Sequence, residues 1–82
     1  MIYVFIAESP DGEIETCRTL IEREIATDYM IGWAEDNGIS LDPEDGDCEI
    51  YLESDDEGDY INQIINESAG RAIIIPCELE EY

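Results

Sequence analysis

The first eighteen residues contain an apolar segment, a turn and a second, more polar segment, which together predict a β-hairpin. Residues 2–7 (IYVFIA) are apolar at every position, which is typical of a strand in the middle of a sheet. Residues 9–12 (SPDG) are a strong turn signal, because proline fixes φ and glycine can adopt a positive φ. Residues 13–18 then return as a second strand. Helical spacing would also allow the following helix to extend back to Ile14, but the turn favours the hairpin.

A capping box and an apolar stripe predict a helix over residues 20–37. The side chains of Thr19 and Glu22 can each satisfy an unpaired backbone amide of the first turn. Gly38 is expected to end the helix in the left-handed conformation, so that Ile39 folds back against the last turn. The apolar stripe contains Ile21, Ile25, Ala26, Tyr29, Met30, Trp33 and Ala34.

The middle of the chain is strongly acidic, since ten of the eighteen residues 42–59 are aspartate or glutamate. Residues 47–54 nevertheless alternate between apolar and polar side chains, which predicts a half-buried strand. The apolar face contains Cys48, Ile50 and Leu52, and the polar face contains Asp47, Glu49, Tyr51, Glu53 and Asp55. Alternate residues on a strand lie about 6.7 Å apart, so the polar face would hold a straight row of carboxylates. That repeat is of the same order as the phosphate spacing of a DNA strand, whose rise is about 3.4 Å per phosphate.

A second capping box, Ser54 with Glu57, predicts another helix that runs through Ser68 and ends at Gly70. Its inward residues would be Tyr60, Ile61, Ile64, Ile65 and Ala69. The last strand covers residues 71–80, where Pro76 indicates a bulge or a sheet edge. The predicted fold is therefore α+β, with the order ββαβαβ and two helices packed on a four-stranded sheet. Residues 1–82 form a single domain.

Net charge restricts the possible partners. The chain has 23 acidic residues against three arginines, with no lysine or histidine, for a formal charge of −20. Direct binding to nucleic acid or to an anionic membrane requires positive charge, so both are excluded. A basic protein surface is the expected partner, because a large field of one sign accelerates association with the opposite sign. Adaptation to high salt is an alternative origin of the charge, although the fourteen isoleucines argue against it.

The residue types also argue against an enzyme, a metal site and a cofactor. Without histidine or lysine, the chain lacks the usual general base and the amine of a Schiff base. A calcium loop that starts at Asp42 would place Gly46 at its fifth position rather than at its sixth. The three cysteines form no Cys-x-x-Cys pair, and we expect buried, reduced thiols within strands, as in a cytosolic protein. The N-terminal apolar run is too short for a signal peptide or a membrane span.

Carboxylates also gather on the outer side of the first predicted helix. Glu24, Asp28 and Glu35 fall within one narrow arc, opposite the apolar stripe. Glu35 and Asp36 occupy the last turn, where the helix dipole disfavours each negative charge by about 0.3–1 kcal/mol. An ordinary solvated helix would mix both signs. The predicted partner-binding surface contains Asp47, Glu49, Tyr51, Glu53, Asp55, Asp56, Glu24, Asp28, Glu35 and Asp36, with Tyr51 as its central anchor. Packing of Tyr51 beside neighbouring strands is an alternative.

In length, charge and rows of carboxylates, the chain resembles small acidic proteins encoded by phages that imitate DNA, such as anti-restriction and anti-CRISPR inhibitors. This resemblance implies a stoichiometric inhibitor that evades host defence by occupying the basic nucleic-acid groove of a CRISPR effector, restriction enzyme or other nuclease. Such an inhibitor would act in the cytoplasm of the infected host cell, as a monomer or a small homo-oligomer. Two alternatives remain open, an immunity protein or antitoxin that caps a cognate nuclease, and a salt-adapted interaction domain without mimicry.

Overall fold

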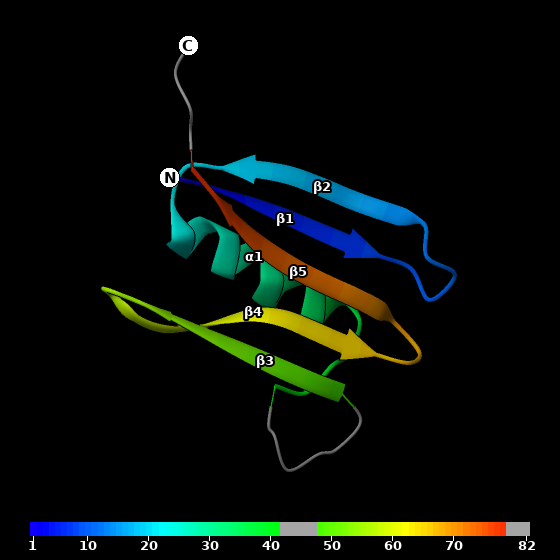
Figure 1. Cartoon of the computed structure of the whole chain (residues 1–82). Helices are drawn as coiled ribbons and strands as arrows, with labels where there is room; N and C mark the ends of the chain where they lie inside the picture. The colour runs from blue at the N-terminus through cyan, green and yellow to red at the C-terminus, as the bar shows by residue number, and fades with distance from the viewer. Residues whose placement is uncertain (42–47, 79–82) are drawn as a thin grey trace.

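A computed structural model describes residues 1–41 and 48–78. In this part of the chain, one antiparallel sheet of five strands carries one helix on a single face (Figure 1). The elements are β1 (Ile2–Glu8), β2 (Ile14–Leu20), α1 (Arg23–Asp36), β3 (Cys48–Asp55), β4 (Gly58–Asn66) and β5 (Gly70–Cys77). Their order across the sheet is β2-β1-β5-β4-β3. The prediction of four strands and two helices was therefore wrong.

The error lies in the predicted second helix, whose sequence forms β4 instead. Residues four apart share one face of a helix and also one face of a strand, so the spacing of Tyr60 and Ile64 fits both structures. Gly58 has a φ of 117°, which ends the tight turn between β3 and β4 and does not belong to a helix. Ser54 forms no capping box, because its hydroxyl is hydrogen-bonded to the Asp59 carboxylate. The abundant β-branched isoleucines favour the strand.

The residues expected to end that helix form the turn from β4 to β5. The Asn66 side-chain oxygen accepts hydrogen bonds from the backbone amides of Ser68 and Ala69, both at 2.9 Å. Gly70 follows with a φ of 105°. A Cβ atom at Gly70 would lie 1.9 Å from the carbonyl oxygen of Glu8, so only glycine fits where β5 enters beside β1.

The predicted N-terminal hairpin is confirmed. β1 pairs with β2 on one side and with β5 on the other, and it therefore lies inside the sheet. The turn is closed by the backbone amide of Gly12, which donates to the Ser9 carbonyl at 2.9 Å. The Ser9 amide donates in turn to the Glu13 carbonyl at 2.8 Å.

The first helix starts later than predicted. β2 continues through Leu20, and Thr19 pairs with Val4 across the sheet instead of capping a helix. The N-cap is Glu22, whose side chain makes no capping hydrogen bond. The C-terminal end agrees with the prediction, since Gly38 has a φ of 68° and the Ile39 amide donates to the Ala34 carbonyl at 2.8 Å.

The core lies between α1 and the sheet. Its fully buried side chains are Phe5 and Ala7 of β1, Ala26, Met30 and Ala34 of α1, Ile64 of β4, and Ala72 and Ile74 of β5. α1 buries one residue per turn, so the stripe is narrower than predicted. Ile25 and Tyr29 are exposed, and Ile21 lies before the helix with 76% exposure. Among the described residues the backbone of α1 approaches every strand except β3, and Leu52, in the second half of β3, is 61% exposed rather than inward.

The cysteines and Pro76 are the remaining strand residues for which the sequence made a prediction. Cys17 is exposed on edge strand β2, so its predicted burial was wrong, whereas Cys48 and Cys77 are half-buried. Pro76 lies in a strand inside the sheet order, but β4 pairs with β5 only through Gly70–Ile73. Beyond that point β5 has β1 as its paired neighbour, and this local edge accommodates the missing amide of Pro76.

Candidate partner-binding surface

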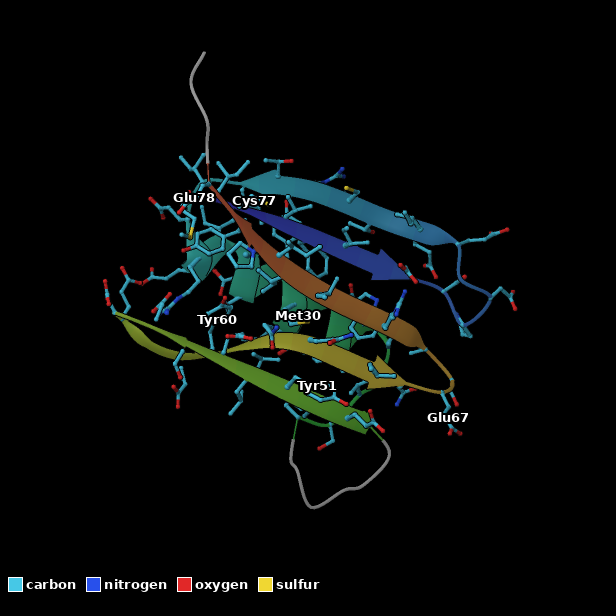
Figure 2. The ribbon with its side chains drawn as sticks, in the orientation of Figure 1. Met30, Tyr51, Tyr60, Glu67, Cys77 and Glu78 are labelled. Carbon is cyan, nitrogen blue, oxygen red and sulfur yellow. The ribbon has the colours of Figure 1, made fainter. Side chains whose placement is uncertain are left out.

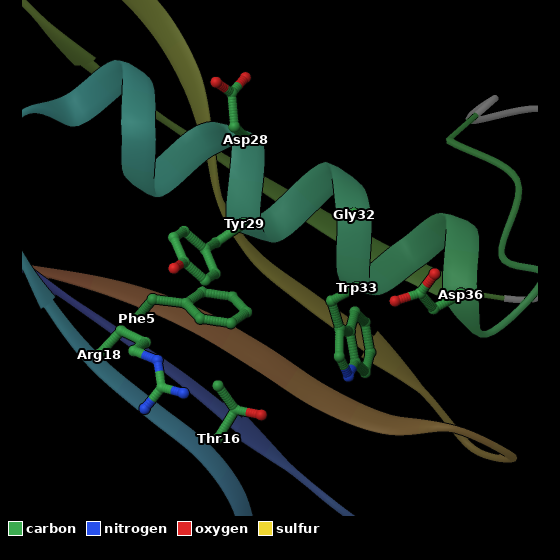
Figure 3. A pocket seen from close by; sticks show the side chains of 8 residues that line it. All are labelled: Phe5, Thr16, Arg18, Asp28, Tyr29, Gly32, Trp33 and Asp36. Carbon is green, nitrogen blue, oxygen red and sulfur yellow. The ribbon is translucent and has the colours of Figure 1, made fainter.

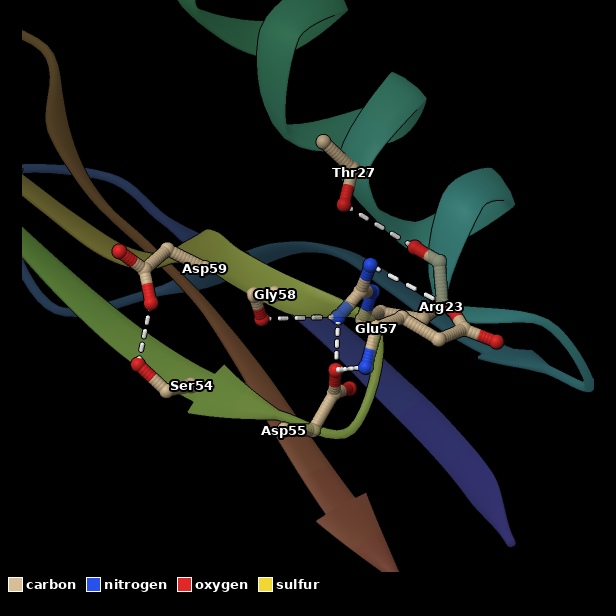
Figure 4. A network of polar contacts seen from close by, with 7 residues as sticks. All are labelled: Arg23, Thr27, Ser54, Asp55, Glu57, Gly58 and Asp59. Carbon is tan, nitrogen blue, oxygen red and sulfur yellow. Dashed lines mark hydrogen bonds and ion pairs between the residues drawn. The ribbon is translucent and has the colours of Figure 1, made fainter.

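Arg23 connects the start of α1 to the turn between β3 and β4 (Figure 4). One guanidinium nitrogen, Nη1, donates to the Asp55 carboxylate and to the Gly58 carbonyl, the latter at 3.2 Å. The other, Nη2, lies 3.3 Å from a Glu57 carboxylate oxygen. The Arg23 side chain is only 13% exposed, and its guanidinium carbon lies 5.1 Å from the ring centre of Tyr60. Arg23 is therefore a crosslink within the fold.

These contacts shift the protonation equilibria of the groups around Arg23. The backbone amide of Glu57, which donates to Asp55 at 2.8 Å, lowers the pKa of the Asp55 carboxyl, and the Arg23 guanidinium lowers it further. Burial raises the pKa of the Tyr60 hydroxyl, and the carboxylates of Glu53 and Asp55 add to this effect. Asp55 thus stays ionised at neutral pH while Tyr60 stays protonated.

Acidic side chains surround this crosslink and form a surface that we term the acidic corner. It consists of Glu22, Glu24, Asp28, Asp55, Asp56, Glu57 and Asp59. Glu22, Glu24 and Glu57 line one groove beside Arg23. Glu24, Asp28 and Asp59 line a second groove, between α1 and β4, with a volume of about 440 Å³. Seven carboxylates and one guanidinium give this corner a formal charge of −6.

The corner unites four residues of the predicted surface, Glu24 and Asp28 of α1 with Asp55 and Asp56 of the turn. Tyr51 lies elsewhere, on the side of the sheet away from α1 (Figure 2), and Glu49, two residues before it on β3, shares that side. There the Tyr51 hydroxyl donates to the Glu49 carboxylate at 2.8 Å, which raises the pKa of Tyr51. Tyr51 is 47% exposed and remains available to a partner. Asp47 is outside the described residues.

The carboxylate row of β3 bends because β4 contains a bulge. Tyr51 pairs with Gln63 and Leu52 with Ile61, so Asn62 is an extra residue in β4. Past this point Glu53 pairs with Tyr60, whose ring is buried against α1. Asp55 then meets Arg23 at the start of α1. The row therefore turns from one side of the sheet toward the other, and it is not the straight row that strict alternation predicts.

The last two predicted acids, Glu35 and Asp36, occupy the far end of α1. Both are exposed, and the last turn of the helix holds no basic residue. Asp36 borders a groove between α1 and β2 of about 500 Å³ (Figure 3). The floor of that groove is aromatic, since it contains Phe5, Tyr29 and Trp33, and Arg18 lies at the β2 side.

Sequence reasoning missed the central role of Arg23, and it also left out Glu22, Glu57 and Asp59. One signal was present, because no basic residue occurs between Arg23 and Arg71. An arginine at the border of so long an acidic segment is a natural crosslink for it.

No known protein family, curated protein or solved structure is detectably similar to this chain. Within residues 1–41 and 48–78, no helix has the length and apolar character needed to cross a membrane. The same residues contain no group of three or more side chains placed to hold a metal ion.

Proposed function

We propose that this protein is a non-catalytic inhibitor that mimics nucleic acid. It occupies the positively charged DNA- or RNA-binding groove of a host defence protein, such as a CRISPR effector or a restriction enzyme, in the cytoplasm of an infected cell. The observation that carries the proposal is the acidic corner, in which carboxylates from α1 and from the β3–β4 turn are held together by Arg23.

The Arg23 crosslink supports this function because it fixes the carboxylates before binding. A flexible acidic segment would lose conformational freedom on entering a groove, and that loss would weaken the complex. Here the turn is held by the Arg23–Asp55 ion pair and by the Asp55–Glu57 hydrogen bond. Asp56 lies at the tip of this turn and is exposed.

The spacing of the helix carboxylates also supports mimicry. Glu24 and Asp28 are one turn apart on α1, which separates them by about 6 Å along the helix axis. Phosphates of one DNA strand have a comparable separation once the helical path is added to the rise of about 3.4 Å. Glu35 continues the same arc toward the C-terminal end of α1. Arginines and lysines that normally contact successive phosphates would meet successive carboxylates.

The exposed acids have few partners of opposite charge in the fold. Arg23 and Arg71 each form ion pairs within the described residues, with Asp55 and Glu57 in one case and with Glu8 in the other. Glu24, Asp28 and Glu35 lie outside these pairs. Their charge is available to a basic partner, and it attracts such a partner over a distance of a Debye length, about 8 Å at physiological salt.

The proposal is tested by adding the purified protein to CRISPR effector nucleases and restriction endonucleases and measuring cleavage of labelled DNA. We expect stoichiometric inhibition of at least one of these enzymes, relieved by preincubation of the enzyme with DNA and weakened by added salt. Inhibition that is insensitive to both salt and competing DNA would contradict mimicry. An immunity protein would instead inhibit a single cognate nuclease toxin and leave the defence enzymes active.

A further inference from the structure

The side of the sheet that faces away from α1 has an apolar centre on β1 and β5, flanked by polar residues such as Gln63 of β4 and Thr19 of β2. Phe5 and Ala7 of β1 point toward α1, so the alternating residues between and beside them point to the other side. Paired residues of neighbouring strands point to the same side of a sheet. On β5, Ile73 is paired with Ile6 and Ile75 with Val4, so both point away from α1. We term this surface the open face and define it by Ile2, Val4, Ile6, Ile65, Ile73 and Ile75. No described residue outside the sheet covers it (Figure 1).

Charge is nearly absent from the open face, although the chain carries a net charge of −20. Glu8 and Arg71, at one end of β1 and β5, neutralise each other, with Nε of Arg71 2.8 Å from Oε2 of Glu8. Glu49 lies on edge strand β3, where it pairs with Ile65 at the margin of the open face. The acidic corner, by contrast, is built on α1 and on the β3–β4 turn. The fold therefore separates its charge from one neutral, aliphatic surface.

We propose that the open face packs against the open face of a second copy of this chain, forming a two-fold symmetric dimer. A basic partner would be expected to meet carboxylates, which the centre of this face lacks, whereas an identical aliphatic sheet is complementary to it. Sheets pack face to face at a separation of about 10 Å, so both helices would lie on the outside. Each acidic corner then remains exposed.

The side of the sheet that carries the open face is large enough for such a dimer if its polar margins are buried together with the aliphatic centre. Five strands spaced by about 4.8 Å and about 20 Å long give the whole side of the sheet an area of about 500 Å², with the aliphatic open face at its centre. Two copies would bury about 1,000 Å² together, which lies at the lower end of specific interfaces. We therefore expect a dimer of moderate affinity.

Salt should have opposite effects on the dimer contact and on binding of a basic partner at the acidic corner. Two chains of charge −20 repel each other, so raising sodium chloride from about 0.05 to 0.5 M should lower the dissociation constant of the dimer. Binding of a basic partner should weaken over the same range. The dimer does not depend on the proposed function, and the two can fail separately.

The test is sedimentation equilibrium of the full chain at several salt concentrations, with two matched variants. Ile75 on the open face and Ile25 on α1 are both 39% exposed. We expect the wild type to sediment at twice the monomer mass of 9.3 kDa, and Ile75→Glu to raise the dissociation constant at least about tenfold. Ile25→Glu adds the same charge away from the face and should leave the dimer intact.

Circular dichroism must show that both variants are folded. If Ile75→Glu does not fold, Thr19→Glu places the charge on an exposed position of the same side and should give the same result. Ile75→Lys should also dissociate the dimer, because we expect dissociation to result from the loss of apolar packing and not from added negative charge. A wild type that stays at 9.3 kDa even at high salt, or equal effects of Ile75→Glu and Ile25→Glu, would overturn the proposal.

Discussion

The Arg23 guanidinium donates a hydrogen bond to the Asp55 carboxylate across 32 positions of the chain. This ion pair joins the first turn of α1 to the turn between β3 and β4. Among the described residues, the backbone of α1 does not approach that of β3, so the pair is a principal link between the helix and the tip of the hairpin. It also fixes the geometry of the acidic corner.

Replacing Asp55 with asparagine should lower the melting temperature, whereas Asp56→Asn should leave it unchanged or raise it. The Asp55 pKa is lowered in the folded protein, so its contribution to stability is fully present above the unfolded-state pKa of about 3.9. The contribution is lost as the pH falls through the folded-state pKa. Thermal melts from neutral pH down to about pH 2 should therefore show a gap between wild type and Asp55→Asn that closes only in acid. A gap that is independent of pH would contradict the ionic role of Asp55.

The turn before β5 should be far less tolerant of substitution than the turn before β2. Gly12 and Gly70 both have positive φ, so alanine at either position costs about 1 kcal/mol in backbone strain. At Gly12 no other atom lies within 4 Å of the new Cβ, whereas at Gly70 the Glu8 carbonyl oxygen lies 1.9 Å away. Urea unfolding should thus show a much larger loss for Gly70→Ala. Equal losses would mean that β1 and β5 do not approach as described.

Salt should stabilise the fold. The 23 acidic residues repel one another at low ionic strength, and sodium chloride at about 0.15–0.5 M shortens the Debye length to between about 8 and 4 Å. We expect the melting temperature to rise by several degrees over this range. A flat response from a well-folded protein would show that the acids are not electrostatically crowded. Complete unfolding without molar salt would favour a salt-adapted domain instead.

The sequence was sufficient to predict those parts of the fold that depend on local signals. The SPDG turn specified the first hairpin, and Gly38 with Ile39 specified the end of α1. The β4 strand was not predictable in the same way, because Tyr60 and Ile64 are spaced for either a helix or a strand. Its identity depends on pairing with β3 and β5, and the spacing of apolar residues within β4 alone does not reveal that pairing. Gly58, inside the predicted helix, was the overlooked signal, whereas Gly70 was interpreted as the end of that helix.

The candidate site was predictable only in part for the same reason. The alternation of apolar and polar residues predicted that Glu49 and Tyr51 share one face of the strand, and the hydrogen bond between their side chains agrees with that prediction. Alternation alone cannot reveal a bulge in the neighbouring strand, and the bulge at Asn62 turns Asp55 toward Arg23. The acidic corner is therefore a product of tertiary structure.

The central claim is that the arrangement of carboxylates, and not bulk charge, is recognised by a basic groove. Two double variants with the same change in charge separate these possibilities. Glu24→Lys with Asp56→Lys alters the acidic corner without removing a partner of Arg23. Glu13→Lys with Glu15→Lys alters the β1–β2 hairpin, at the opposite end of the sheet (Figure 1).

The measurement is the affinity of each folded variant for a nuclease that the wild type inhibits, together with the association rate. We predict that the corner pair weakens binding by about a hundredfold or more, because each reversal removes an attraction and adds a repulsion in the groove. The hairpin pair should mainly slow association, since distant charges act through steering. Equal losses of affinity from both pairs would contradict the account, because bulk charge alone would then explain binding.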